Sequence, residues 1–210
     1  MRMLLLSSTL TNETLKQTLL QMLSKPPKDH KILIINQVQY VLDQLPEYTE
    51  IAKNMVKRDK EILTDLGFSS ETINIYDVVN IEKPNLHEVD LLWIQGGNNF
   101  YYLQQIREKG YMEDIRGFIE KNGVYVGTSA GSMMMSPSVD VNLTMDENLV
   151  ELEDVTGFGI IPFFIVPHWD SMDEDVRVRM LGYAGESGKK VISLTDQQGI
   201  LVTDKETRVI

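Results

Sequence analysis

Cysteine is absent from this chain of 210 residues, and long apolar runs are absent as well. Without cysteine the chain can form no disulfide, no thiolate metal site and no cysteine nucleophile. No stretch reaches the roughly 18 consecutive apolar residues of a membrane-spanning helix. The apolar part of the initial MRMLLLSSTL is too short for the core of a secretory signal and predicts a first β-strand instead. We therefore expect a cytoplasmic protein.

Positive charge is also scarce, because 20 Lys and Arg residues stand against 31 Asp and Glu residues, a net charge of −11. Such a surface repels phosphate groups, so we expect neither nucleic acid nor an anionic membrane as a partner. The apolar fraction of 42% is typical of a globular protein, and the length suits one domain spanning residues 1–210. The pattern is compatible with a monomer or a homodimer.

Short apolar runs alternate with helical patterns along the chain, which predicts an α/β fold with a doubly wound, mostly parallel sheet flanked by helices. Predicted strands cover residues 3–6, 31–35, 73–76, 91–95, 124–126, 163–166, 191–194 and 199–203. Predicted helices cover residues 12–23, 48–66, 100–109, 112–121 and 173–184, the last ending near Gly185. Residues 137–160 interrupt this rhythm as an inserted loop or small β excursion, and the C-terminal residues predict a short β-hairpin.

Reactive residues follow four of the predicted strands directly. Ser129 follows 124–126, His168 follows 163–166, Asp196 follows 191–194, and the turn Gly96-Gly97-Asn98 follows 91–95. Since ligands of parallel sheets bind beyond the carboxyl ends of the strands, we expect these residues to meet on one rim. Asn98 is then placed to contact a substrate.

Ser129 lies in the sequence GTSAG, which fits G-x-S-x-G, the sharp strand-to-helix turn that exposes a nucleophilic serine. The alternative is an ordinary turn with small residues for packing. A serine hydroxyl needs a base, and His168 is the histidine that follows a strand, because His30 and His87 precede theirs. The backbone amides of Gly97 and Ala130 are candidates for an oxyanion hole.

The acid that would orient the imidazole of His168 is less well defined by the sequence. Asp196 has the best position, and Asp146, Asp170 and Glu186 are competitors. No metal or cofactor is required by this chemistry. Acidic residues between 140 and 151 faintly resemble a calcium loop, but Met145 occupies the position where such a loop needs glycine, and the alternation of apolar residues indicates a strand.

Four segments, IQGGNNFYYL, VGTSAGS, IVPHWD and VISLTDQQGI, occur in this order and jointly resemble the peptidase E (aspartyl dipeptidase) family of serine peptidases, which includes a cyanophycinase-like branch. The resemblance extends over most of the chain. It implies a fold like that of class I glutamine amidotransferases, with serine in place of the usual cysteine nucleophile. It also implies Ser129 as nucleophile, His168 as base, and an oxyanion hole formed with Gly97 and Ala130.

The sequence departs from that family at two points. The family typically has glutamate as the third catalytic residue, whereas this chain has Asp196, one methylene shorter, and an alternative assignment places the acid near Asp146. The aspartyl dipeptidase branch needs a cation to bind a substrate aspartate, and we expect an arginine after the serine. The segment SPSVDVNLTMDEN contains neither arginine nor lysine.

The sequence therefore predicts a serine exopeptidase, dipeptidase-like, that hydrolyses small peptides through a Ser-His-acid triad and an acyl-enzyme. Cleavage of Asp-X dipeptides is one possible specificity. Two alternatives stay open on the same fold: a binding or regulatory protein without peptidase activity, and a different acyl hydrolase such as an esterase or amidase.

Overall fold

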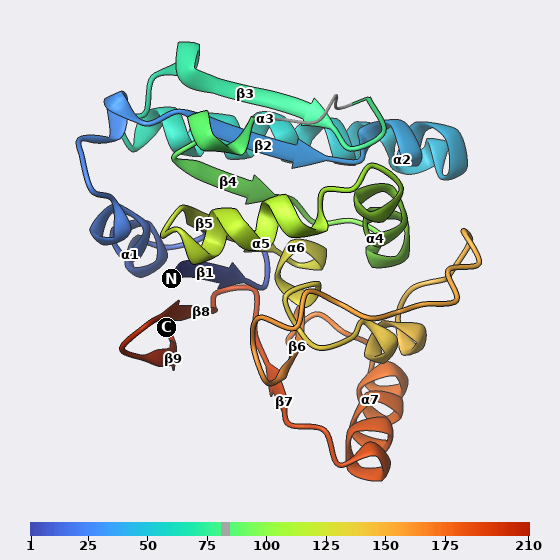
Figure 1. Ribbon diagram of the computed structural model, residues 1–210. Coiled ribbons are helices and arrows are strands. Elements are labelled where there is room, and N and C mark those ends of the chain that lie inside the picture. Colours follow the sequence, from blue (N-terminus) through green and yellow to red (C-terminus); the bar gives the residue numbers. More distant parts are fainter. Residues whose placement is uncertain (81–84) are drawn as a thin grey trace.

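The computed structural model describes residues 1–80 and 85–210, and it arranges seven strands in one sheet (Figure 1). The parallel strands, in spatial order, are β3 (Ile73–Asp77), β2 (Ile32–Asn36), β4 (Leu91–Ile94), β5 (Val124–Thr128) and β1 (Arg2–Leu6). Next to β1, β8 (Gly199–Thr203) runs antiparallel and forms a hairpin with β9 (Thr207–Val209). The predictions of a mostly parallel sheet and of a terminal hairpin are confirmed.

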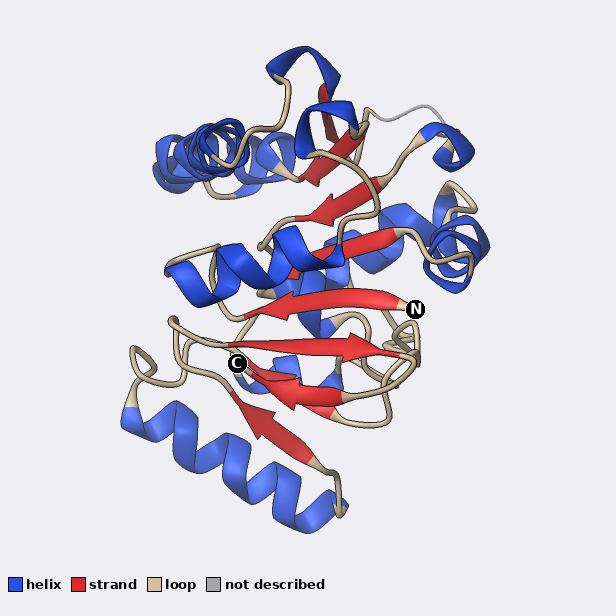
Figure 2. Ribbon diagram, turned by 90° about the vertical axis from the view of Figure 1, so that its left-hand side faces the viewer, coloured by secondary structure: helices blue, strands red, loops and turns tan. Residues whose placement is uncertain are grey.

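Helices cover both faces of this sheet, as Figure 2 shows from the side. α1 (Glu13–Met22) and α3 (Thr49–Asp65) pack on one face, and α4 (Asn99–Glu108) and α5 (Met112–Glu120) pack on the other. Successive side chains of β1 enter opposite cores: Leu4 packs with the first pair of helices, and Met3 packs with the second. Both faces of the central strands are therefore buried, which explains why their sequences are almost continuously apolar.

The strands before and after α7 (Glu174–Ser187) do not join the main sheet. β6 (Phe164–Val166) and β7 (Val191–Ser193) instead form a separate parallel pair, which lies with α7 beyond the β1 side of the main sheet in Figure 1. The expectation that one sheet holds all strands is wrong at this point. The physical reason is that β8 pairs with β1 along its whole length, from Arg2 opposite Thr203 to Leu6 opposite Gly199, and so occupies that edge.

Three further elements differ from the sequence prediction. α2 (Val38–Gln44) was not predicted, and α7 continues to Ser187, where Gly188 with φ 63° ends it. Residues 137–160 contain a 3₁₀ helix, Asp140–Thr144, so the strand indicated by the alternation there is wrong. The Asp140 carboxylate accepts a hydrogen bond from Tyr183 Oη (2.5 Å) and pairs with Lys189, which fixes that segment against α7.

The remaining helical elements are short. α6 (Ala130–Met133) follows β5, and 3₁₀ turns occur at Pro27–Asp29, Pro46–Tyr48, Ser70–Thr72 and Leu86–Glu88. None of the helices in residues 1–80 and 85–210 is long and apolar enough to cross a membrane.

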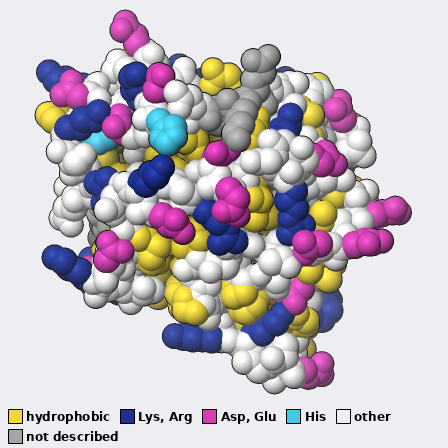
Figure 3. All heavy atoms as spheres, in the orientation of Figure 1, with side chains coloured by type: hydrophobic (Ala, Val, Ile, Leu, Met, Phe, Trp, Pro, Cys, Tyr) yellow, Lys and Arg dark blue, Asp and Glu magenta, His cyan; other side chains and the backbone are white. Residues whose placement is uncertain are grey.

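Acidic and basic side chains are intermixed on the face drawn in Figure 3. Some form exposed pairs along helices, such as Glu50 with Lys53 (2.9 Å) and Glu174 with Arg177 (3.1 Å). Such exposed pairs contribute only up to about 1 kcal/mol each. Stability therefore depends mainly on the apolar cores, two against the main sheet and a smaller one between α7 and β6, in which each fully buried large side chain contributes about 1.5–3 kcal/mol.

Gly131 marks the closest approach of α6 to the sheet. A Cβ atom on Gly131 would lie 2.1 Å from the carbonyl oxygen of Ile94 in β4, so no larger residue fits without a backbone shift. We expect Gly131→Ala to lower the free energy of unfolding by about 1–3 kcal/mol, the usual cost of overpacking. Urea denaturation monitored by circular dichroism measures this.

Gly182→Ala is the matched control, because Gly182 lies within α7 and a Cβ there meets nothing within 4 Å. Alanine is the better helix former by about 1 kcal/mol, so this variant should be as stable as the wild type or more so. Equal stability of the two alanine variants would contradict the tight packing of α6 on β4.

Candidate active site

Ser129 occupies a strained turn between β5 and α6. Its φ and ψ angles are 47° and −108°, a region that residues other than glycine rarely adopt. The Ser129 N–H donates to the carbonyl oxygen of Leu6 at the end of β1 (3.0 Å), and the carbonyl oxygen of Ser129 accepts from the Met133 N–H (3.0 Å). The turn is thus fixed on both sides, and it presents a half-buried hydroxyl at the carboxyl rim of the sheet.

His168 contacts Ser129 from the small sheet. Its Nε2 lies 3.0 Å from Ser129 Oγ, and its Nδ1 lies 2.6 Å from Oδ1 of Asp196. Because a carboxylate only accepts, the proton belongs on Nδ1, which leaves Nε2 free to accept the proton of the serine. The structure thus brings together Ser129, His168 and Asp196, three residues far apart in the sequence.

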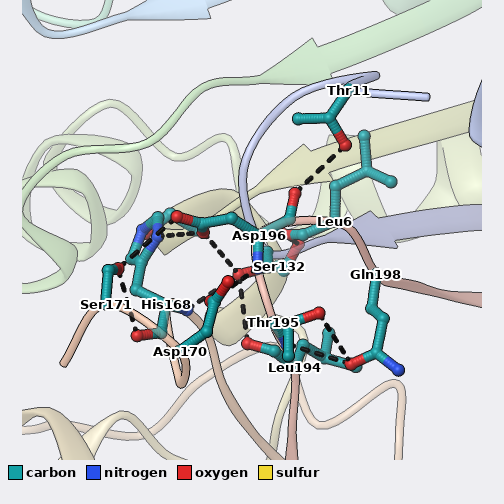
Figure 4. A network of polar contacts seen from close by, with 12 residues as sticks. Leu6, Thr11, Ser132, His168, Asp170, Ser171, Leu194, Thr195, Asp196 and Gln198 are labelled. Carbon is teal, nitrogen blue, oxygen red and sulfur yellow. Dashed lines mark hydrogen bonds and ion pairs between the residues drawn. The ribbon is translucent and has the colours of Figure 1, made fainter.

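The backbone of His168 is also unusual, with φ 58°. The following residue, Trp169, donates its N–H to the carbonyl oxygen of Leu194 (3.0 Å), so the loop after β6 is joined to the end of β7. This connection places His168 beside Asp196, as Figure 4 shows.

Among the described residues, the candidate acids Asp170 and Glu186 make no hydrogen bond to the imidazole of His168. Oδ1 of Asp170 accepts the backbone N–H of Asp196 (2.9 Å), so Asp170 supports the loop rather than the imidazole (Figure 4). Glu186 is exposed on α7.

The loop that carries Asp196 is also held by Thr11, the residue two positions before α1. Thr11 Oγ1 donates to the backbone oxygen of Asp196 (3.1 Å).

Ser7 is a site residue that the sequence analysis missed. It is fully buried at the end of β1, its Oγ accepts the His168 N–H (2.7 Å), and the same Oγ lies 3.1 Å from Oδ1 of Asp196. The rule applied to the other strands, that polar residues directly after a strand reach the rim, would have selected it.

The turn after β4 lies directly beside Ser129. A Cβ atom on Gly96 would be 3.2 Å from Cβ of Ser129, and Gly97 has φ 149°. Within the described residues, neither the N–H of Gly97 nor that of Ala130 donates to a protein acceptor. Two unpaired amides next to the hydroxyl are what stabilisation of an oxyanion requires.

Asn98 has partners within the protein at both ends of its side chain. Its Oδ1 accepts the N–H of Tyr101 and caps α4 (3.0 Å), and its Nδ2 donates to the carbonyl oxygen of Glu147 (2.9 Å). These contacts give Asn98 a structural role in the turn. Its contact with substrate stays a prediction.

Asp146 lies near this turn without an ion-pair partner among the described residues. Burial raises the pKa of its carboxyl group above the ordinary value, although the Asn99 amide and the nearby His168 act in the opposite direction. The site thus contains a desolvated carboxylate that is separate from the pair formed by His168 and Asp196.

No group of three or more His, Asp or Glu side chains in the described part of the chain is arranged to hold a metal ion.

Comparison with known proteins gives one family. The sequence model of peptidase family S51 matches residues 3–210. An uncharacterized peptidase of Pasteurella multocida is 23% identical over 171 residues, which are 80% of this chain and 79% of that protein. Peptidase E of Salmonella arizonae is 26% identical over 172 residues, 80% of this chain and 69% of that protein.

A solved structure supports the fold. The crystal structure of a candidate peptidase E protein from Listeria monocytogenes superposes with a TM-score of 0.78 and covers 100% of this chain and 97% of that one, at 19% sequence identity. At this identity the similarity concerns the fold alone. The predicted α/β class with a mostly parallel, helix-flanked sheet is therefore confirmed.

We expect Asp146→Asn to raise the melting temperature at pH 7. Because the pKa of Asp146 is raised in the native protein, the wild type loses stability as the pH rises from the ordinary Asp pKa of about 3.9 through the raised value. Asparagine cannot ionise and avoids this loss. The advantage of the variant should be present at pH 7 and disappear below about pH 4.

Calorimetric scans between pH 3.5 and 7.5 test this, with Asp154→Asn as the control. Hydrogen bonds to Thr156 hold the pKa of Asp154 below its ordinary value, so this substitution should change stability in the opposite direction at pH 7, and by little because the group is exposed. A lower melting temperature of Asp146→Asn at pH 7 would mean that the Asn99 contact outweighs burial.

Proposed function

We propose that this chain, which belongs to peptidase family S51 and is a serine-type peptidase, is a dipeptidase-like exopeptidase acting on small peptides. The observation that carries this proposal is the pair of contacts made by the imidazole of His168, in which Nε2 lies 3.0 Å from Ser129 Oγ and Nδ1 lies 2.6 Å from Asp196 Oδ1. These distances suit transfer of the serine proton to the imidazole.

In the proposed reaction, Ser129 Oγ attacks the scissile carbonyl carbon while His168 Nε2 takes the hydroxyl proton. His168 then gives this proton to the leaving amine, and water releases the acyl group from Ser129 by the reverse sequence. Asp196 fixes the Nδ1–H tautomer and stabilises the imidazolium. An aspartate is long enough for this role here, because the loop after β7 lies directly beside His168.

The proposed oxyanion hole consists of the N–H groups of Gly97 and Ala130. Their contribution would be large, since loss of one such donor typically costs about 3 kcal/mol of transition-state stabilisation. The amide of Ala130 begins α6, so its position follows from the turn at Ser129.

The carboxylate of Asp146 supports the exopeptidase assignment. A desolvated acidic group that interacts with His168 and has no Lys or Arg partner among the described residues suits the α-ammonium group of a peptide substrate. The same carboxylate would repel the side chain of a substrate aspartate, so we propose that Asp-X dipeptides are poor substrates. The absence of arginine and lysine from residues 136–148 agrees with this view.

We expect Ser129→Ala to abolish cleavage of a library of free dipeptides, with the released amino acids measured by mass spectrometry and the same dipeptides with acetylated N-termini assayed in parallel. The wild type should cleave free dipeptides and leave the acetylated ones intact, because acetylation removes the ammonium group. Cleavage that persists in Ser129→Ala would rule out the serine mechanism. Efficient cleavage of the acetylated peptides would indicate an acyl hydrolase that does not read the N-terminus.

Asp196→Asn should lower kcat by about 10³–10⁴-fold with little change in KM, since asparagine favours the wrong imidazole tautomer. Asp170→Asn is the matched control, because the Asp170 carboxylate accepts the backbone N–H of Asp196 and, among the described residues, does not bond to the imidazole; the kcat of this variant should fall far less. Asp146→Asn should instead raise KM for free dipeptides. Steady-state kinetics on one dipeptide separates the three, and equal losses of kcat in Asp196→Asn and Asp170→Asn would contradict the assignment.

A further inference from the structure

A cavity of about 130 Å³ lies between α2, α3 and the turn after β4. Most of its wall is apolar, formed by Val38, Val41, Ile51, Ala52 and Met55. An apolar cavity of about 150 Å³ accommodates a benzene ring, so this space suits one side chain of leucine or phenylalanine size.

The cavity lies next to the candidate active site. Gly96 and Gly97 form part of its wall, and a Cβ atom on Gly96 would lie 3.2 Å from Cβ of Ser129 and 3.5 Å from Cε of Met55. The cavity therefore lies close to the nucleophile proposed above.

Gln37 is a buried polar residue in the wall of this cavity. Its side chain is 3% exposed and lines the cavity, and neither Nε2 nor Oε1 has a hydrogen-bond partner among the described residues. A Cβ atom on Gly97 would lie 1.5 Å from Nε2 of Gln37, so the amide occupies space that only glycine leaves open. A buried amide without partners costs stability, whereas an apolar side chain at this position would not.

A primary amide offers one donor group and one acceptor, which match the C=O and N–H of a peptide main chain. The residues that line the cavity include no charged side chain among those described, so a substrate carboxylate or ammonium group there would be desolvated without compensation. Exposed Tyr48 and Ile51 extend the apolar surface at the cavity.

We propose that this cavity is the subsite for one neutral, apolar residue of the peptide substrate, with the Gln37 amide hydrogen-bonded to the substrate main chain. The inference rests on the proposed peptidase function and defines its substrate class as peptides with a leucine-like residue next to the scissile bond. Gln37 then acts as a specificity residue, and Gly97 makes room for it.

The test measures binding separately from turnover. Calorimetry with Ser129→Ala protein compares Leu-Ala, Ala-Leu, Ala-Ala and Asp-Ala, and cleavage of the same peptides by the wild type is measured in parallel. We expect one of the leucyl peptides to bind at least about tenfold more tightly than Ala-Ala, as for a side chain that fills an apolar pocket. Asp-Ala should bind no better than Ala-Ala.

Ala52→Leu, which fills the cavity, should remove most of the preference for leucine and leave Ala-Ala binding nearly unchanged. Ala184→Leu on α7 controls for an added leucine away from the site. Gln37→Met keeps the apolar wall but removes the amide, and it should weaken binding of the leucyl and alanyl peptides by a similar factor while the melting temperature stays equal or rises.

The outcomes separate the two proposals. A leucine preference that Ala52→Leu does not change, tighter binding of Asp-Ala than of Leu-Ala and Ala-Leu, or no binding of any of the peptides would overturn the subsite. Pocket-dependent binding of leucyl peptides that the wild type never cleaves would support the subsite and reject the peptidase reaction.

Discussion

The hydroxyl of Ser7 connects the two parts of the structure on which the site depends. It accepts the backbone N–H of His168 and lies within hydrogen-bonding distance of Asp196, so a single buried group at the end of β1 orients both residues from the small sheet. Ser129, in contrast, follows a strand of the main sheet, and its N–H donates to the carbonyl oxygen of Leu6, the residue just before Ser7. The end of β1 is thus the common reference for all three side chains, and a shift of the small sheet would separate His168 from Ser129.

Two polar groups at this rim reduce stability in the free protein. The carboxyl group of Asp146 is desolvated, and the amide of Gln37 lacks partners among the described residues. Groups of this kind are expected where function is favoured over stability. In the proposals made above, a bound peptide supplies a positive charge to Asp146 and hydrogen bonds to Gln37.

Much of the fold could be predicted from the sequence because parallel strands buried on both faces leave a strong apolar signal. The rim positions of Ser129, His168 and Asp196 followed from that signal, since each comes directly after a strand. Ser7 and Gln37 also follow strands, β1 and β2, and were overlooked because no sequence motif such as the G-x-S-x-G around Ser129 marks them. The separate pairing of β6 with β7 could not be predicted, because it depends on β8 taking the free edge of β1, a long-range contact. The alternation of polar and apolar residues at 140–144 gave a wrong strand prediction for a similar reason. Asp140 is held in place by Tyr183 and Lys189, which are distant in the sequence.

Positive φ angles at Ser129 and His168 have a consequence for protein design. Both side chains start from backbone conformations that ordinary helices and strands do not offer. Grafting the three side chains onto an unrelated scaffold would therefore fail to reproduce the 3.0 Å approach of Nε2 to Oγ unless the two turns were transplanted with them. The transferable unit is a pair of bent loops together with the strand end that anchors them.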